Sequence, residues 1–248
     1  MNSKKSHKVI IIIMIALVVD VIGFVIWGLT PQRPMPEAMA YLESSRNVSV
    51  EKSRWLAFIP KENKTNTGFI FYPGGRVDYR SYAPPAFKLA EEGLQVVLVP
   101  MPLNLAGWKP DKAWEIMQKY PGIKHWVIGG HSLGGSMAAK FAYENPGIVD
   151  GLILWASYPA KRNSLADTSL RVISIYGSRD GAVDKEMYDN SHKLLPDDAI
   201  FVEIEGGNHA QMGWYGPQHG DLDATIMREA QQQILVQRTW DFISSLFW

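Results

Sequence analysis

The stretch "IGGHSLGGSMAAKFAY", residues 128–143, places a serine between two pairs of glycines, directly before a run with helical spacing. The preceding residues, "HWVI" at 125–128, are typical of a short buried strand. Gly130, Ser132 and Gly134 fit the pattern G-x-S-x-G, in which the serine occupies a sharp turn between a strand and a helix. Neighbouring side chains must be very small there, so that strand and helix can pass closely. The stretch predicts a nucleophilic serine, although glycines also mark ordinary turns.

Strand-like and helix-like segments alternate along the rest of the chain. We expect an opening hairpin over 47–60 and buried parallel strands at 67–75, 94–102, 125–132, 151–158, 171–178 and 199–206. Helices are expected at 82–92, 111–120, 132–144, 185–195 and 224–246. This alternation predicts an α/β fold, a mostly parallel sheet with helices on both faces. Ligands of such sheets bind at the carboxyl ends of the strands.

A serine hydroxyl becomes a good nucleophile when a base takes its proton, and the base needs an acid to orient it. Asp180 follows the strand at 171–178, and His209 follows the strand at 199–206. The predicted triad is therefore Ser132, Asp180 and His209. Asp184 is a rival acid, and His219 is a weaker rival base because it follows no strand. A turn or cap role is the alternative for Asp180, and loop packing for His209.

The oxyanion of an acyl-transfer intermediate also needs hydrogen-bond donors. The backbone N–H of Leu133, directly after the serine, is the expected first donor. The early loop "FYPGGRVDYRSYAP", residues 71–84, offers Gly75 or Arg76 for the second, and glycine lets a ligand approach the backbone closely. We favour Gly75, although the glycines of this loop could also serve only a turn.

These segments together resemble the α/β-hydrolase superfamily, specifically its alpha/beta hydrolase fold-5 group, related to dienelactone hydrolase-like proteins. The resemblance rests on "TGFIFYPGGRVDYRSYAP", "GGHSLGGSMAAKFA", "LILWASYPA", "IYGSRDGAVD" and "IEGGNHAQMGWYG". It implies the same triad and the same two oxyanion donors, with no cofactor. Many relatives have His-Gly after the early strand, whereas this chain has Pro73-Gly74. Dienelactone enzymes use a cysteine, and this chain has none, so their substrate is not carried over.

The substrate pocket is expected to be open. Only about a dozen residues, 160–170, are available where relatives insert a lid, which excludes a large one. Trp108, Trp214 and Tyr215 are candidates to hold an apolar acyl or alcohol group, with core or surface packing as the alternative. Arg76 and Arg179 are candidates to bind a substrate carboxylate, unless they are solvated surface residues.

The N-terminal segment is long and apolar enough to cross a bilayer. Residues 9–29 are apolar except for Asp20, and at about 1.5 Å per residue they match a hydrocarbon thickness of roughly 30 Å. We expect a short basic end over 1–8, a transmembrane anchor over 9–29, a proline-rich linker over 30–40 and the hydrolase domain over 41–248.

Lysines before the apolar run place the N-terminus in the cytoplasm and the catalytic domain outside the membrane. The alternative is a secreted protein released by signal cleavage, for which "AMA" at 38–40 is a candidate site. The apolar run is longer than a usual signal core, which favours the anchor.

The composition narrows the function further. Lys+Arg and Asp+Glu balance at 25 each, which argues against nucleic-acid partners. The six histidines are scattered and no HExxH motif occurs, so no metal or other cofactor is expected. The best hypothesis is a membrane-anchored serine hydrolase for small-molecule esters. The alternatives are an acyltransferase on the same triad and a non-catalytic interaction module. The sequence gives no indication of oligomeric state.

Overall fold

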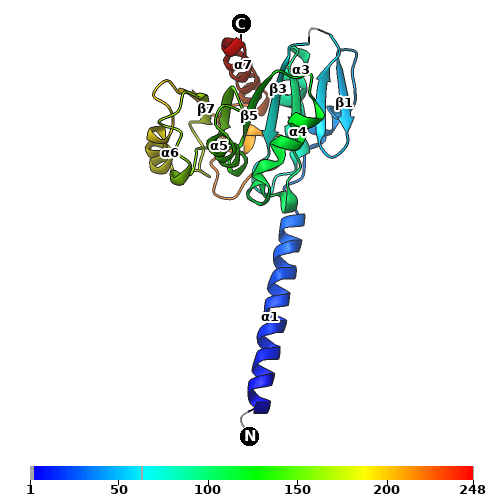
Figure 1. Ribbon diagram of the computed structural model, residues 1–248, viewed down its shortest axis with the longest axis vertical. Coiled ribbons are helices and arrows are strands. Elements are labelled where there is room, and N and C mark those ends of the chain that lie inside the picture. The colour runs from blue at the N-terminus through cyan, green and yellow to red at the C-terminus, as the bar shows by residue number, and fades with distance from the viewer. Residues whose placement is uncertain (1–2, 63, 248) are drawn as a thin grey trace.

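The computed structural model describes residues 3–62 and 64–247 (Figure 1). Within these ranges eight strands form one sheet, in the order β1-β2-β4-β3-β5-β6-β7-β8. The strands are β1 Val48–Lys52, β2 Leu56–Pro60, β3 Thr67–Tyr72, β4 Gln95–Leu98, β5 His125–His131, β6 Gly151–Trp155, β7 Arg171–Gly177 and β8 Ile200–Ile204. The α-helices are α1 Ser3–Leu29, α2 Pro36–Ala40, α3 Ala83–Glu91, α4 Ala113–Lys119, α5 Leu133–Glu144, α6 Lys185–Ser191 and α7 Arg228–Phe247.

The sheet is parallel from β4 through β8, and the expected hairpin of β1 and β2 joins it antiparallel at β4. One apolar core lies under α3 and α7, and a second lies under α4 and α5. The central strands β3, β4 and β6 are buried along their whole length. The predicted α/β fold with helices on both faces is therefore confirmed.

The strand β8 departs from the expectation of a fully buried strand. It forms the edge of the sheet beside β7, and both Ile200 and Phe201 are 38% exposed. An edge strand has a neighbour on one side only, so an apolar run does not guarantee complete burial.

Residues 30–40, for which we expected a spacer, instead lie against the domain. Gln32 forms a parallel bridge with Val77, and Pro34 forms an antiparallel bridge with Tyr215. The short helix α2 begins at Pro36, where proline suits a first turn, and it buries Ala38 completely. Packing of this segment begins about nine residues before the predicted domain boundary at 41.

Helix α1 projects away from the domain as a single long rod (Figure 1). Its residues Ile10–Leu29 are long and apolar enough to cross a membrane, and nearly all of them are exposed, with Gly28 at the domain end buried. Asp20 is the charged residue within this stretch. The helix is therefore a candidate transmembrane span, and a signal sequence would have the same properties.

Candidate active site

Ser132 lies on a strained turn between β5 and α5. Its φ and ψ are 52° and −122°, a region that a residue other than glycine occupies at a cost of about 1–3 kcal/mol. The Ser132 N–H donates to the Trp155 carbonyl at 3.0 Å, and the Ser132 carbonyl accepts from the Ser157 hydroxyl at 2.6 Å. Contacts from β6 and the loop after it thus hold the backbone in its strained conformation.

The glycines around Ser132 are required by close backbone contacts, as the sequence predicted. A Cβ on Gly130 would lie 2.5 Å from the Tyr72 carbonyl oxygen. A Cβ on Gly134 would collide with the carbonyl oxygens of both Tyr72 and Pro73. Strand β3 therefore passes directly beside the turn, and only glycine fits at either position.

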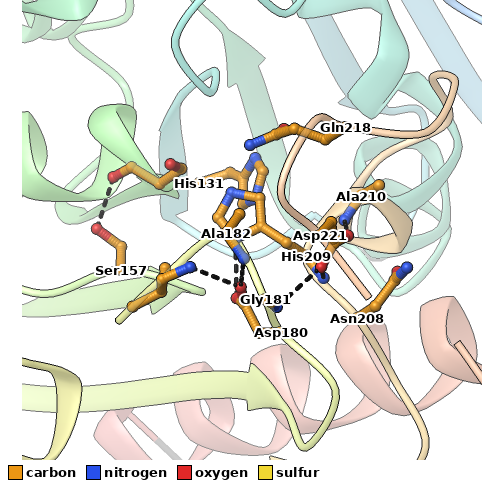
Figure 2. A network of polar contacts seen from close by, with 12 residues as sticks. His131, Ser157, Asp180, Gly181, Ala182, Asn208, His209, Ala210, Gln218 and Asp221 are labelled. Carbon is orange, nitrogen blue, oxygen red and sulfur yellow. Dashed lines mark hydrogen bonds and ion pairs between the residues drawn. The ribbon is translucent and has the colours of Figure 1, made fainter. Parts of the chain in front are cut away.

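Asp180 and His209 form a buried pair (Figure 2). The His209 Nδ1 lies 2.8 Å from Asp180 Oδ2, with side-chain exposures of 1% and 7%. The other Asp180 oxygen, Oδ1, accepts hydrogen bonds from the Ala182 and Val183 amides, each at 3.0 Å. Among the described residues His209 Nε2 is buried without a hydrogen-bond partner. The pair therefore has an oriented imidazole whose second nitrogen is available to accept a proton.

Asp221 ties the two loops that carry this pair together. Its Oδ1 accepts from the Gly181 N–H at 3.0 Å and from the His209 N–H at 3.3 Å, and its Oδ2 accepts from the Ala210 N–H at 2.8 Å. Figure 2 shows Asp221 beside the backbone of the histidine loop. This carboxylate fixes the separation of Asp180 and His209 through their backbones.

Asn208, the residue before His209, connects the histidine loop to α7 by hydrogen bonds. Gln231 Oε1 accepts from the Asn208 N–H at 3.0 Å, and Gln231 Nε2 donates to the Asn208 carbonyl at 2.7 Å. Gln231 is fully buried, so this two-way amide contact is sheltered from water. The helix α7 thus contributes directly to the position of the candidate base.

A second buried histidine, His131, lies beside the candidate base. The ring centroids of His131 and His209 are 4.4 Å apart (Figure 2). Burial, and to a lesser extent the neighbouring His209, hold the pKa of His131 well below its ordinary value. Its Nδ1 shares a 2.8 Å hydrogen bond with the Tyr82 hydroxyl, which also accepts from the Gly74 N–H at 3.1 Å. Because His131 is neutral, it does not repel the positive charge that His209 carries when protonated.

The rival residues have other contacts. Asp184 caps α6, because its Oδ1 accepts from the Met187 N–H at 2.8 Å. His219 is exposed on the loop before α7. The geometry therefore favours Asp180 over Asp184 and His209 over His219.

The two predicted oxyanion donors lie next to each other. A Cβ on Gly75 would lie 3.2 Å from Leu133 Cδ2 and 3.5 Å from Leu133 Cβ. Within the described residues neither the Leu133 N–H nor the Gly75 N–H donates a hydrogen bond. Leu133 is also the first residue of α5, where the helix dipole favours negative charge.

The five predicted pocket residues have different surroundings. Tyr215 is fully buried and Trp214 is 9% exposed, so both belong mainly to the interior. Trp108 is 59% exposed, and Arg76 binds carbonyls at the end of α1. Arg179 Nε donates to a loop carbonyl at 2.6 Å. Trp214 and Tyr215 therefore take the packing role that was the alternative to substrate binding. Arg76 and Arg179 both donate hydrogen bonds to backbone carbonyls of the protein.

The comparisons with known proteins agree with this fold. A family model described as "Alpha/beta hydrolase family" matches residues 68–233. The chain belongs to the alpha/beta hydrolase family. No sequence match was found among curated proteins. Among the residues that the structure describes, no group of three or more His, Asp or Glu side chains is arranged to hold a metal ion.

Solved structures of other alpha/beta hydrolases share the fold at low sequence identity. The carboxylesterase CesB of Bacillus subtilis is 10% identical with a TM-score of 0.58, over 84% of this chain and 94% of that chain. Est1E of Butyrivibrio proteoclasticus, solved with ferulic acid bound, is 13% identical with a TM-score of 0.58, over 81% and 98%. Dienelactone hydrolase of Anabaena variabilis is 16% identical with a TM-score of 0.53, over 77% and 97%. The family match supports a hydrolase, and these neighbours share its fold.

Three side chains of this alpha/beta hydrolase escaped the sequence analysis, namely His131, Tyr82 and Asp221. His131 is next to the predicted nucleophile, and its position within G-x-S-x-G was the available signal. Tyr82 lies 50 residues before Ser132, and Asp221 lies 41 residues after Asp180. Neither residue belongs to a recognisable motif, so spacing alone offered no signal for either.

Proposed function

We propose that the protein is a membrane-anchored serine hydrolase that cleaves carboxylic esters through Ser132, Asp180 and His209. The observation that carries the proposal is the buried 2.8 Å contact between His209 and Asp180, with no hydrogen-bond partner for His209 Nε2 among the described residues. An imidazole held in this way is prepared to accept a hydroxyl proton. Hydrogen bonds to a catalytic serine are often loose before substrate binds.

The proposed reaction has two stages. His209 Nε2 takes the Ser132 proton while Ser132 Oγ attacks the ester carbonyl, and the amides of Leu133 and Gly75 bind the developing oxyanion. The proton then passes from His209 to the departing alcohol, leaving an acyl group on Ser132. Water, deprotonated by His209, then attacks the acyl carbonyl, and His209 returns that proton to Ser132 Oγ as the bond to serine breaks and the carboxylic acid leaves.

The carboxylate of Asp180 stabilises the imidazolium that forms in each stage. The neighbouring His131 is neutral, so it adds no positive charge that would destabilise the His209 imidazolium. Both effects operate in a water-poor interior, where charge interactions are strong.

The apolar helix α1 supplies the proposed anchor. Its lysine-rich leading end is assigned to the cytoplasm and the hydrolase domain to the opposite side. Protease added to intact cells is expected to digest the domain and spare the lysine-rich end. Protection of the domain would reverse the assigned orientation.

The nucleophile is tested with a fluorophosphonate probe on the purified full chain. We expect labelling of the wild type and loss of both labelling and p-nitrophenyl acetate cleavage in Ser132→Ala. Ser136→Ala is the matched control, since this serine lies four residues on in α5 and keeps its backbone contact to the Ser132 carbonyl. Ester cleavage that persists in Ser132→Ala would reject the proposed nucleophile.

The base is tested with a second matched pair. His209→Ala is expected to abolish acylation, whereas His219→Ala leaves it unchanged because His219 is exposed. The reverse result would assign the base to His219.

A further inference from the structure

Side chains from the loops after β3 and β4 form hydrogen bonds with the last turn of α1 and the residue after it. Arg76 Nε donates to the Trp27 carbonyl at 3.0 Å, and Arg76 Nη2 donates to the Thr30 carbonyl at 2.7 Å. The guanidinium also lies 4.3 Å from the centre of the Trp27 ring. Asn104 Nδ2 donates to the Gly28 carbonyl at 2.9 Å. The terminal carbonyls of a helix lack partners within it, so these two side chains satisfy and cap the end of α1.

The chain beyond α1 continues this attachment. The Gln32 N–H donates to the Arg76 carbonyl at 2.7 Å, and the Asp78 N–H donates to the Gln32 carbonyl at 3.0 Å. Backbone pairing directly after a capped helix leaves little freedom for a hinge. The orientation of the domain relative to α1 is therefore set by the fold and not by a loose linker.

The edge of the sheet that meets α1 is the edge that carries the candidate site. Arg76 directly follows Gly75, a proposed oxyanion donor, and the Arg76 N–H donates to the Asn104 carbonyl at 2.8 Å. Leu105 Cδ2 would lie 3.8 Å from a Cβ on Gly75. In Figure 1 α1 leaves the domain at one side, and the C-terminal end of α7 lies at the opposite side.

Exposed aromatic rings line the junction. Phe24 stacks on Trp27 with ring centroids 5.7 Å apart, and it lies 6.4 Å from the ring of Trp108. Phe24 and Trp27 belong to the candidate span, whereas Trp108 belongs to the domain, in the loop after β4. Tryptophan is enriched where a membrane meets water, and 59% of Trp108 is exposed. The loop that carries Trp108 thus reaches the level of the last turns of the span.

We propose that the carboxyl edge of the sheet faces the bilayer surface and that the enzyme takes its substrate, a long-chain acyl ester, from that bilayer. The chemistry of this proposal rests on the proposed function, whereas the orientation rests only on the contacts between α1 and the domain. With α1 spanning the membrane, the clamp of Arg76 and Asn104 holds the loop of Gly75 next to the lipid headgroups. An acyl chain then needs to move only a short distance out of the membrane to reach Ser132.

The orientation is tested with single spin labels, for which the cysteine-free chain is well suited. Gly107→Cys places a label beside Trp108 near the carboxyl edge, and Gly122→Cys places one before β5 at the amino edge. Apart from its chain neighbours, a Cβ at either position meets no atom of the described residues within 4 Å, so neither substitution is expected to disturb the fold.

Each labelled full chain is reconstituted in phosphatidylcholine vesicles, and its relaxation by oxygen, which enters lipid, is compared with that by a water-soluble nickel chelate. We expect a higher ratio of oxygen to nickel accessibility at position 107 than at position 122. Equal ratios, or a higher ratio at 122, would overturn the orientation whatever the enzyme hydrolyses.

The substrate class is tested with p-nitrophenyl palmitate placed either in the vesicles that hold the full chain or in separate vesicles. We expect initial hydrolysis at least about tenfold faster when enzyme and ester share a vesicle, because tethering raises the local concentration. Soluble p-nitrophenyl acetate in the same samples, with Ser132→Ala as background, reports the chemistry alone. Cleavage of the acetate with equal palmitate rates in both arrangements overturns the bilayer substrate but leaves the proposed function standing. Absence of Ser132-dependent cleavage of either ester overturns the proposed function itself, and with it the substrate class.

Discussion

Replacing Asp180 with asparagine changes the hydrogen-bond partner of His209 with little change in shape. The Asp180 Oδ1 atom accepts from two backbone amides, and an asparagine oxygen can keep both contacts. The atom facing His209 Nδ1 at 2.8 Å then becomes an NH2 donor. His209 must accept this bond at Nδ1, so its proton moves to Nε2 and the base loses its function.

The expected loss in kcat follows from this change of tautomer. Where a triad aspartate is replaced in this way while the geometry is kept, kcat falls by about 10⁴-fold, which corresponds to about 5 kcal/mol of activation free energy. The fold should lose less, because a hydrogen bond to a charged group contributes about 1.5–3 kcal/mol and part of it is replaced. Activity is therefore predicted to disappear in a protein that remains folded.

The assay is single-turnover acylation by p-nitrophenyl acetate, alongside thermal unfolding of the full chain in detergent. Asp184→Asn is the matched control four residues on, since Asp184 caps α6 and asparagine caps equally well. An acylation rate within about threefold of wild type in Asp180→Asn, well inside the factor of ten that about 1.4 kcal/mol represents, would refute the assigned acid. Loss of acylation in Asp184→Asn instead would transfer the role to that residue.

Three further predictions concern residues around the site. Asp221→Ala should lower kcat by about 10²-fold with KM little changed, because the substitution shifts the backbone of the histidine loop. Asp221→Asn should restore part of the loss. Steady-state kinetics of both variants are the measurement, and a lower yield of soluble protein with unchanged kcat would show that the role of Asp221 is purely structural. The pKa of buried His131 lies below its unfolded value of about 6.5, so the unfolded chain binds more protons as the pH falls. The contribution of neutral His131 to the free energy of unfolding is then fully present above about pH 6.5, and it falls by up to about 1.4 kcal/mol per pH unit below that value. Denaturant titrations of His131→Gln should therefore show a shallower fall with decreasing pH than those of the wild type. Gly134→Ala places a Cβ against backbone oxygens and should destabilise the fold by about 3 kcal/mol or more, whereas Gly107→Ala should leave the melting temperature unchanged; a stable Gly134→Ala would show that strand and helix can separate at this turn.

Local signals in the sequence were enough to locate the strands, most of the helices and the turn at Ser132. Strand β5 and helix α5 meet at Ser132 because an apolar run ends in glycines where the helical spacing begins. Asp180 and His209 each follow a parallel strand, so their loops had to share the carboxyl edge. Their 2.8 Å contact agrees with that expectation.

Contacts between residues distant in sequence were beyond such signals. Asp221 serves two loops through backbone amides, and any acidic residue at that place in the sequence could equally have been solvated. Arg76 was a candidate to bind a substrate carboxylate or to be solvated at the surface. Its guanidinium instead donates to the carbonyl of Thr30, which directly follows α1 and lies 46 residues earlier. The segment over 30–40 was read as a spacer from its prolines, and its bridges to the domain have no local pattern.

The sequence by itself determined the α/β fold, the apolar helix at the N-terminus and the order in which the proposed nucleophile, acid and base follow one another. It did so because hydrophobic periodicity and glycine placement are local consequences of backbone geometry. The tertiary structure alone decided which acid meets the histidine, that a second, uncharged histidine lies beside it, and that α1 is capped by the loop of the proposed oxyanion donor. These depend on which surfaces meet after folding, and the energies of burial and hydrogen bonding that select them act between residues far apart in the chain.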